Sequence, residues 1–195
     1  MCDVPGVSGV PAVADFIGKR LLEEREDLWF HRSMPSLAIG TKLPDAAMSV
    51  MTENGPAIVQ LASKLAGRKT VVFALPGAFT GTCSTKHLPS FMRTLEAFKA
   101  KGVEEIFCVV VNDPFVLQAW GAATGSTAAG ITLLADADGS FTNEIGMAFS
   151  APAIGLYNRS NRYALVVNDG VVTHANLDAP GVCDLSTGEA LLALL

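Results

Sequence analysis

The chain has 195 residues, of which 50% are hydrophobic and 17% are charged, a composition typical of a globular protein. Its net charge of -5 and pI near 5.1 argue against a protein that binds nucleic acid or an anionic membrane surface, because both functions need a basic face. The apolar runs are far shorter than the ~18 residues that span a bilayer, so we expect no contact with a membrane interior.

The four cysteines, at positions 2, 83, 108 and 183, show no spacing typical of a shared site. They form no C-x-x-C pair, and the chain is too long to depend on a disulfide scaffold. With three histidines in all, a zinc cluster is not expected either. The pattern favours a reducing compartment and thiols that act individually.

The first 34 residues differ from the rest and predict an N-terminal extension to a single domain over 35–195. Residues 1–16 are rich in Gly, Pro and Val without the regions of a secretory signal, and residues 13–30 have the spacing of a short amphipathic helix. Its acidic cluster, Glu23, Glu24, Glu26 and Asp27, argues against a mitochondrial presequence. We expect this helix to pack on the domain or on a partner subunit.

Strands and helices alternate along the predicted domain. Apolar runs predict strands at 69–75, 105–111 and 131–136, and a hairpin over 162–177 that turns at Asn168-Asp169-Gly170. Helices are predicted over 83–101, 113–125, 140–149 and 186–195, the last with Ser186 and Glu189 at capping-box spacing. This order predicts an α/β, thioredoxin-like fold with a central mixed, mostly parallel sheet flanked by helices.

Cys83 begins the helix that follows the first core strand, in the segment PGAFTGTCSTKHLP at 76–89. A cysteine reacts as its thiolate, and bringing a thiol pKa from about 8.5 to about 6 requires roughly 3.4 kcal/mol. A helix start supplies about 0.3–1 kcal/mol, or about 2 kcal/mol when partly buried. We therefore expect a guanidinium to supply the remaining stabilisation.

The residues before Cys83 favour a small polar ligand beside the sulfur. Gly77 and Gly81 let a ligand approach the backbone closely, and Pro76 stiffens the turn that leaves the strand. Thr80 and Thr82 add hydroxyl groups that can donate or accept hydrogen bonds.

This segment resembles the active-site pattern of the peroxiredoxins, in which proline, three residues, threonine or serine and two residues precede a cysteine. It is most similar to the type II, peroxiredoxin-5-like branch. The resemblance continues in VVVNDPFVLQAW, LLADADGSFTNEIG and NRYALVVNDGVV, and covers roughly residues 37–195.

The resemblance implies a peroxidase that reduces hydrogen peroxide and organic hydroperoxides through a cysteine sulfenic acid, with no metal or organic cofactor. It implies that Cys83 is the nucleophile, that the Thr80 hydroxyl hydrogen-bonds the peroxide and that Pro76 shields the thiolate from water. Arg162 matches the family's active-site arginine, whereas Arg159 falls three residues too early.

By the same resemblance, Phe79, Gly81 and Thr82 lie at the substrate site. The family usually has proline at position 81, and glycine there predicts a more mobile loop. Phe79 and Trp120 are candidates for an apolar rim, although core packing is an equal alternative for Trp120. His87, four residues after Cys83, is expected to pack or hydrogen-bond rather than to form a Cys–His pair or half of a metal site.

The thiol that resolves the sulfenic acid is open between three alternatives. Cys183 corresponds to the loop in which animal members of the branch carry a resolving cysteine, and it is the preferred candidate. Cys108 lies within a buried strand, where packing is the simpler interpretation, although plant members have a cysteine at this offset. In the third alternative no second cysteine takes part, and an external thiol such as glutathione with glutaredoxin reduces the Cys83 sulfenic acid directly. If Cys183 or Cys108 resolves it, a reductant such as thioredoxin, or glutathione with glutaredoxin, reduces the resulting disulfide.

Two other functions share parts of this pattern. A thioredoxin-like disulfide reductase needs a second cysteine at position 86, which is Lys86. A redox sensor or holdase would share the thiol chemistry without sustained turnover. The resemblance further implies a homodimer, and the absence of an S-K-L ending leaves the cytoplasm and the mitochondrion as expected compartments.

Overall fold

The structure, a computed structural model, describes residues 37–195. The predicted Gly/Pro/Val-rich tail and the predicted helix over 13–30 lie outside the described residues. The domain boundary at 34/35 therefore stays a prediction.

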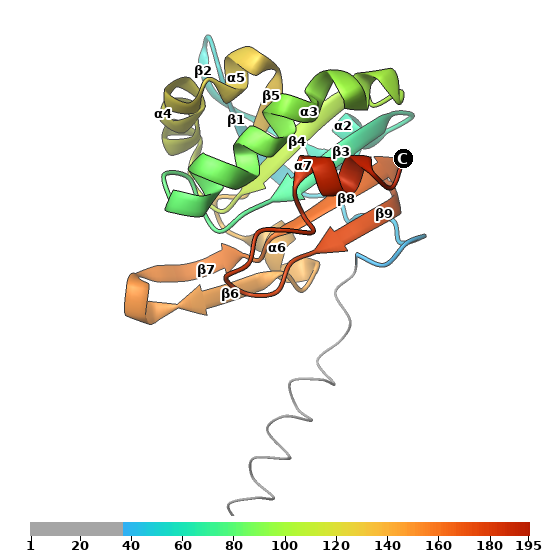
Figure 1. The fold of residues 1–195 in the computed structure, drawn as a ribbon. Helices are drawn as coiled ribbons and strands as arrows, with labels where there is room; N and C mark the ends of the chain where they lie inside the picture. The colour runs from blue at the N-terminus through green and yellow to red at the C-terminus, as the bar shows by residue number, and fades with distance from the viewer. Residues whose placement is uncertain (1–36) are drawn as a thin grey trace, which may run out of the picture. The chain divides into compact units, whose positions relative to one another are not determined.

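A seven-stranded mixed sheet forms the centre of the described domain, in the order β2-β1-β5-β4-β3-β8-β9 (Figure 1). The strands are β1 (Ala47–Thr52), β2 (Gly55–Gln60), β3 (Lys69–Ala74), β4 (Glu105–Val110), β5 (Ile131–Ala135), β8 (Tyr163–Asn168) and β9 (Val171–Leu177). A second sheet pairs β6 (Ala148–Ala151) with β7 (Leu156–Ser160).

The predicted thioredoxin-like alternation is confirmed, but the sheet is less parallel than expected. Parallel pairing is confined to β3–β4 and β4–β5 among the six neighbouring pairs. The reason is a hairpin of β1 and β2, which the sequence analysis did not identify and which joins β5 in antiparallel orientation at Ser49 and Ala135. The β8–β9 hairpin is confirmed, and Asp169 and Gly170 both have the positive φ that a two-residue turn requires.

Helices cover both faces of the sheet. They are α2 (Leu61–Leu65), α3 (Leu88–Ala100), α4 (Pro114–Thr124), α5 (Ser126–Ala129), α6 (Ser140–Glu144) and α7 (Gly188–Leu192), with a π-helical segment at Cys83–His87 and a 3-10 turn at Pro152–Ile154. Strand residues of alternating parity enter two separate cores: Val71 and Phe73 pack with α3, α4 and α7, whereas Val72 and Ala74 pack with α2 and α6.

Two predicted helix boundaries are wrong for local reasons. The helix predicted over 140–149 ends at Glu144, because Gly146 adopts a left-handed conformation (φ 72°) and Ala148 begins β6. The expected capping box at Ser186 does not form. Thr187 caps α7 instead by accepting from the N–H of Ala190.

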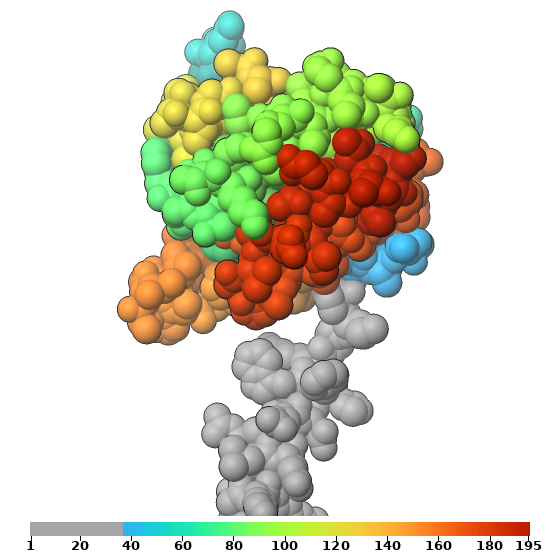
Figure 2. Space-filling view, viewed as in Figure 1, coloured from blue at the N-terminus to red at the C-terminus, as the bar shows by residue number. Residues whose placement is uncertain are grey.

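The C-terminal segment packs against α3 on one face of the molecule, as the contact between the red and green surfaces in Figure 2 shows. The backbone N–H of Gly188 donates to Ser90 Oγ at 2.8 Å, and a Cβ at position 188 would lie 2.7 Å from the Ser90 carbonyl oxygen. This close approach brings the loop before α7 next to the helix that follows Cys83.

Candidate active site

Cys83 lies in the first turn of a helix that begins at Gly81, directly beyond β3. The N–H of Ser84 reaches the carbonyl of Thr80 at 3.1 Å, and the helix start leaves earlier N–H groups without intrahelical acceptors. The Cys83 side chain is fully buried in the core beneath α3 and α4. The thiol therefore sits among positive backbone dipoles in a dry environment.

The turn that carries Cys83 is π-helical from Cys83 to His87, so the N–H of Leu88 bonds to the carbonyl of Cys83. Pro89 explains this widening, because proline lacks an N–H and its ring clashes with the carbonyl four residues earlier in an α-helix. The helix predicted over 83–101 is thus confirmed in position, with an irregular first turn at the candidate nucleophile.

The loop before the helix has a fixed, strained conformation. Phe79 has a positive φ of 59°, which non-glycine residues seldom adopt. The Thr80 hydroxyl donates to the carbonyl of Gly77 at 2.9 Å, and the N–H of Ala78 donates to Asn112 Oδ1 at 3.1 Å. Strain of this kind clusters at functional sites.

Asn112 and Arg159 belong to this site, although the sequence analysis did not assign either of them to it. Arg159 Nη1 donates to the carbonyl of Val111 at 2.8 Å and would lie 3.2 Å from a Cβ at Gly77. The position of Asn112 was predictable, because it follows the strand next to β3 and parallel strands end at one edge. Arg159 reaches the loop from β7, which no apolar pattern indicated.

Arg162, which stands just before β8, contacts the ring of His87. Its Nη1 lies 3.3 Å from His87 Nδ1. His87 is fully buried, and its Nε2 lies 2.8 Å from the carbonyl oxygen of Ser186. Burial is the main cause that lowers the pKa of His87 to about 4; the charge of Arg162 acts in the same direction, and the hydrogen bond to Ser186 and the charge of Asp178 oppose it. The imidazole is therefore neutral near pH 7, and the structure assigns His87 a hydrogen-bonding role, as expected.

Asp178 organises the loop that approaches His87. Its carboxylate accepts from the N–H groups of Asp184, Leu185 and Ser186 at 2.8–3.3 Å, and from the hydroxyl of Ser186. The same hydroxyl oxygen lies 3.1 Å from His87 Nε2. A continuous polar chain thus runs from the end of β9 to Arg162.

Cys183 lies in this loop and is buried, with 6% of its surface exposed. Lys86, on the π-helical segment, donates to the Cys183 carbonyl oxygen. Burial raises the pKa of the Cys183 thiol, Arg162 and Lys86 oppose this effect, and Asp178 and Cys83 add to it. Cys183 is therefore within electrostatic range of the candidate nucleophile.

Cys108 lies in the middle of β4, and its side chain enters the same apolar core as Cys83. Complete burial raises the pKa of the Cys108 thiol well above its ordinary value, and a charge on Cys83 would raise it further. These features suit a packed thiol held on a central strand.

The two aromatic candidates occupy different environments. Trp120 is fully buried and its Nε1 donates to Ser84 Oγ at 2.9 Å, so it belongs to the core and supports the turn that holds Cys83. Phe79 is 60% exposed at the loop, where a rim residue would lie, and Phe115 at the start of α4 is 61% exposed. Gly81 and Thr82 are also exposed, and Pro76 is half-buried.

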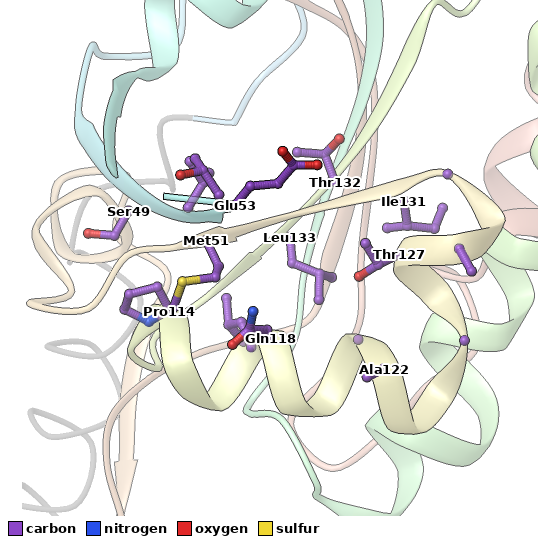
Figure 3. Close-up of a pocket in the computed structure, with 17 residues that line it drawn as sticks. Ser49, Met51, Glu53, Pro114, Gln118, Ala122, Thr127, Ile131, Thr132 and Leu133 are labelled. Atoms are coloured by element: carbon purple, nitrogen blue, oxygen red, sulfur yellow. The ribbon is translucent and has the colours of Figure 1, made fainter. Parts of the chain in front are cut away.

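None of these residues lines the groove of about 920 Å³ that lies between α4 and α5 and the strands β1 and β5 (Figure 3). Met51, Gln118 and Leu133 line it. Glu53 is the one titratable side chain among the described residues of its wall, which offers no thiol. Within residues 37–195, no cluster of three potential metal ligands occurs and no helix is long and apolar enough to cross a membrane.

Comparisons with known proteins show which sequences and structures this chain resembles. The sequence model of the family described as Redoxin matches residues 38–192. The chain is 44% identical over 164 residues to Peroxiredoxin-2E-2, chloroplastic, of Oryza sativa subsp. japonica, covering 82% of this chain and 73% of that protein. It is 39% identical over 163 residues to Peroxiredoxin-2B of Arabidopsis thaliana, covering 83% and 100%.

Among solved structures, reduced Prx3 in complex with H2O2 from Vibrio vulnificus superposes with a TM-score of 0.76 at 42% identity. The match covers 80% of this chain and 98% of that one. Oxidized Prx3 from the same organism gives a TM-score of 0.75 at 43% identity, covering 82% and 99%.

Proposed function

Because the chain belongs to the peroxiredoxins, a family of thiol-dependent peroxidases, we propose that Cys83 is the residue whose sulfur attacks the peroxide. The observation that carries this proposal is its placement. Cys83 lies fully buried in the first turn of the helix after β3, and Arg162 is held against His87, four residues further along the helix.

In the proposed reaction, the Cys83 thiolate attacks one oxygen of ROOH in line with the O–O bond. An S–O bond forms, the O–O bond breaks, and the departing RO⁻ takes up a proton to leave as an alcohol, or as water when the substrate is hydrogen peroxide. Sulfur is oxidised to the sulfenic acid, the reversible first product of thiol oxidation.

Charge moves from sulfur to the leaving oxygen, so fixed donors along that path stabilise the transition state. The free N–H groups of the helix start and the guanidinium of Arg162 supply these donors. The Thr80 hydroxyl donates its hydrogen bond to the Gly77 carbonyl oxygen. Its oxygen lone pairs therefore remain to accept a hydrogen bond from the O–H of the peroxide. Pro76, half-buried beside the loop, limits the access of water.

For the second half of the cycle, we propose Cys183 as the resolving thiol. Its sulfur attacks the sulfenic sulfur of Cys83, a disulfide forms, and the displaced hydroxide leaves as water. Support comes from its place in the connection between β9 and α7, within electrostatic range of Cys83, whereas Cys108 is fixed in a central strand. An external dithiol of the thioredoxin type, or glutathione with glutaredoxin, returns both thiols.

The test uses the full chain and one equivalent of hydrogen peroxide, followed by intact-mass analysis and peptide mapping. We expect a loss of two hydrogens between Cys83 and Cys183 in the wild type, and a gain of one oxygen at Cys83 in Cys183→Ser. Cys83→Ser should lose peroxide-dependent thiol oxidation, and retained oxidation would refute the assignment. A disulfide to Cys108, or none, would instead refute Cys183 as the resolving thiol.

Sustained turnover separates the peroxidase from a sensor on the same fold. With thioredoxin and its reductase present, a peroxidase consumes many equivalents of peroxide per chain, and a sensor consumes one. We expect turnover with both hydrogen peroxide and an organic hydroperoxide, because apolar Phe79 borders the loop.

We further propose a homodimer that pairs through the active-site edge of the sheet. Phe79 and Phe115 follow the adjacent parallel strands β3 and β4 and are exposed there. Sedimentation analysis of Phe115→Glu should give a monomer, and an unchanged dimer would place the interface elsewhere.

We propose the cytoplasm or the mitochondrion as the compartment, because all three cysteines in the described part of the chain are free thiols. Imaging of the tagged full chain in its cell of origin tests this assignment. A signal in another organelle would overturn it.

A further inference from the structure

The candidate arginine is supported by a series of polar groups that comes from the C-terminal part of the sequence. Asp178 follows β9, Ser186 precedes α7, and His87 lies in the segment of Cys83. The contacts run from the Asp178 carboxylate to Ser186, from Ser186 to His87, and from His87 to Arg162.

The hydrogen-bonding partners of the ring fix the tautomer of His87. A guanidinium has only donors, so the Nδ1 atom at 3.3 Å from Arg162 must be the acceptor. The ring proton then resides on Nε2, which donates to the Ser186 carbonyl oxygen at 2.8 Å. The Ser186 hydroxyl donates a hydrogen bond to the Asp178 carboxylate. Every polar atom of the ring thus has one assigned role.

Asp178 fixes Ser186 in place rather than contacting Arg162 through its carboxylate. The carboxylate binds three successive N–H groups, those of residues 184–186, and the N–H of Asp178 itself donates to the Arg162 carbonyl oxygen at 3.2 Å. The Ser186 carbonyl oxygen, which accepts the hydrogen bond from His87, is therefore held at a defined place relative to Arg162.

A neutral imidazole has a particular advantage as the partner of Arg162. A carboxylate would hold the guanidinium equally well but would neutralise part of its charge. A neutral ring orients the guanidinium and leaves its whole charge for an anionic sulfur and a departing oxyanion. Along the side-chain contacts, two residues, Ser186 and His87, separate the carboxylate of Asp178 from the guanidinium of Arg162.

We propose that Asp178 and Ser186 are positioning residues for the peroxide reaction, which hold His87 as the Nε2–H tautomer and through it direct Arg162 toward Cys83. This inference rests on the proposed role of Cys83. It makes the connection between β9 and α7, which also carries Cys183, a determinant of the first chemical step as well as of the second.

The first measurement is the tautomer itself, from long-range ¹H–¹⁵N correlation spectra of the full, reduced chain between pH 5.5 and 8. We expect a single neutral Nε2–H form for His87 in the wild type and a mixture of tautomers in Asp178→Asn and Ser186→Ala. An Nδ1–H form or a protonated ring in the wild type would overturn the proposal without any variant.

The second measurement is the rate constant for oxidation of Cys83 by hydrogen peroxide in single-turnover stopped flow. Small displacements of a catalytic group cost up to about 100-fold, so we expect both variants to react about 10- to 100-fold more slowly. Their rate of alkylation by neutral iodoacetamide at pH 10, a condition that favours the thiolate of any ordinary cysteine, should stay within about two-fold. Equal losses in both reactions would indicate general disruption and would count against positioning.

The matched control is Thr187→Ala, which removes the neighbouring hydroxyl and the cap of α7 but no member of the polar chain. It should keep the wild-type tautomer and peroxide rate. Should Asp178→Asn fail to fold, Ser186→Ala and the wild-type spectrum still decide. If the wild type is oxidised at Cys83 and both variants react at the same rate, only the positioning role is refuted. If the wild type is not oxidised at Cys83, the proposed function is refuted.

Discussion

The hydroxyl of Thr80 donates its proton to the carbonyl oxygen of Gly77 at a distance of 2.9 Å. This bond closes the loop three residues before Cys83 and fixes the direction of the hydroxyl lone pairs. Because the proton is committed, the hydroxyl acts on a bound peroxide only as an acceptor. The peroxide then donates its O–H to Thr80, and the oxygen that carries this proton is the one that the sulfur attacks.

Replacement of Thr80 by valine should therefore slow the peroxide reaction strongly while preserving the shape of the side chain. Loss of one preorganised hydrogen bond at a reacting centre typically costs about 100- to 1,000-fold in rate. Stopped-flow oxidation of Thr80→Val by hydrogen peroxide measures the effect. Thr80→Ser, which keeps the hydroxyl, should remain within about 10-fold of wild type, and a valine variant as fast as the serine variant would exclude a role for the hydroxyl.

His87 predicts a pH dependence of stability. Its pKa is about 4 in the folded chain, against 6.5 ordinarily, because it is buried. Between these values the unfolded chain binds a proton that the folded chain does not, so lowering the pH favours unfolding. The free energy of unfolding should fall by about 3 kcal/mol from pH 7 to pH 4 through this group.

Urea unfolding of wild type and His87→Gln at half-unit pH intervals isolates that contribution. The difference between the two proteins should change across pH 4–6.5 and stay constant above pH 7. His174→Gln removes a histidine from β9 without touching the polar chain and serves as the control. Parallel pH curves for wild type and His87→Gln would show that the folded chain binds the same proton.

The fold followed from the sequence where apolar runs were continuous. The strands of 69–75 and 105–111 are buried on both faces, so nearly every residue is apolar and the pattern is unambiguous. The β1–β2 hairpin escaped because its strands are half-exposed, contain Ser49, Thr52 and Pro56, and carry a weaker alternation. Half-exposed strands of this kind are fixed by tertiary pairing rather than by their own residues.

At the site, a local motif placed Cys83, Thr80 and the loop between them, because these residues are neighbours in sequence. The polar chain through Asp178 and Ser186 could not be read in the same way. Its members are separated by about a hundred positions from His87, and Ser186 looked like a helix cap in isolation. Only the docking of α7 on α3 shows that its hydroxyl is used elsewhere.

Gly81 offers a test of loop mobility next to the nucleophile. Its added Cβ would meet nothing within 4 Å, and it stands at the first helical position, which proline tolerates well. Gly81→Pro should raise the free energy of unfolding by about 0.4–1 kcal/mol by restricting the unfolded chain.

The same substitution should change how peroxide reaches the buried sulfur. Cys83 has no exposed surface, so the peroxide enters as the loop opens. A stiffer loop should lower the rate with a bulky organic hydroperoxide more than the rate with hydrogen peroxide. Stopped-flow rates with both substrates measure this ratio, and an unchanged ratio would show that the loop does not gate access.

Gly188 joins the stability of the domain to the geometry of the site. A Cβ there would lie 2.5 Å from Thr94 Oγ1 and 2.7 Å from the Ser90 carbonyl oxygen, and the latter is backbone that cannot rotate away. Gly188→Ala should therefore push α7 off α3 and destabilise the fold by about 1–3 kcal/mol.

Because Ser186 lies two residues earlier, the displacement should also slow oxidation of Cys83 by peroxide, at conditions where the variant is fully folded. Urea unfolding and stopped-flow kinetics measure the two effects, with Gly81→Ala as the control for stability alone because its added methyl group meets open space. A Gly188→Ala protein as stable as wild type would mean that α7 and α3 have room to separate without cost, and it would remove the packing basis for the placement of Ser186.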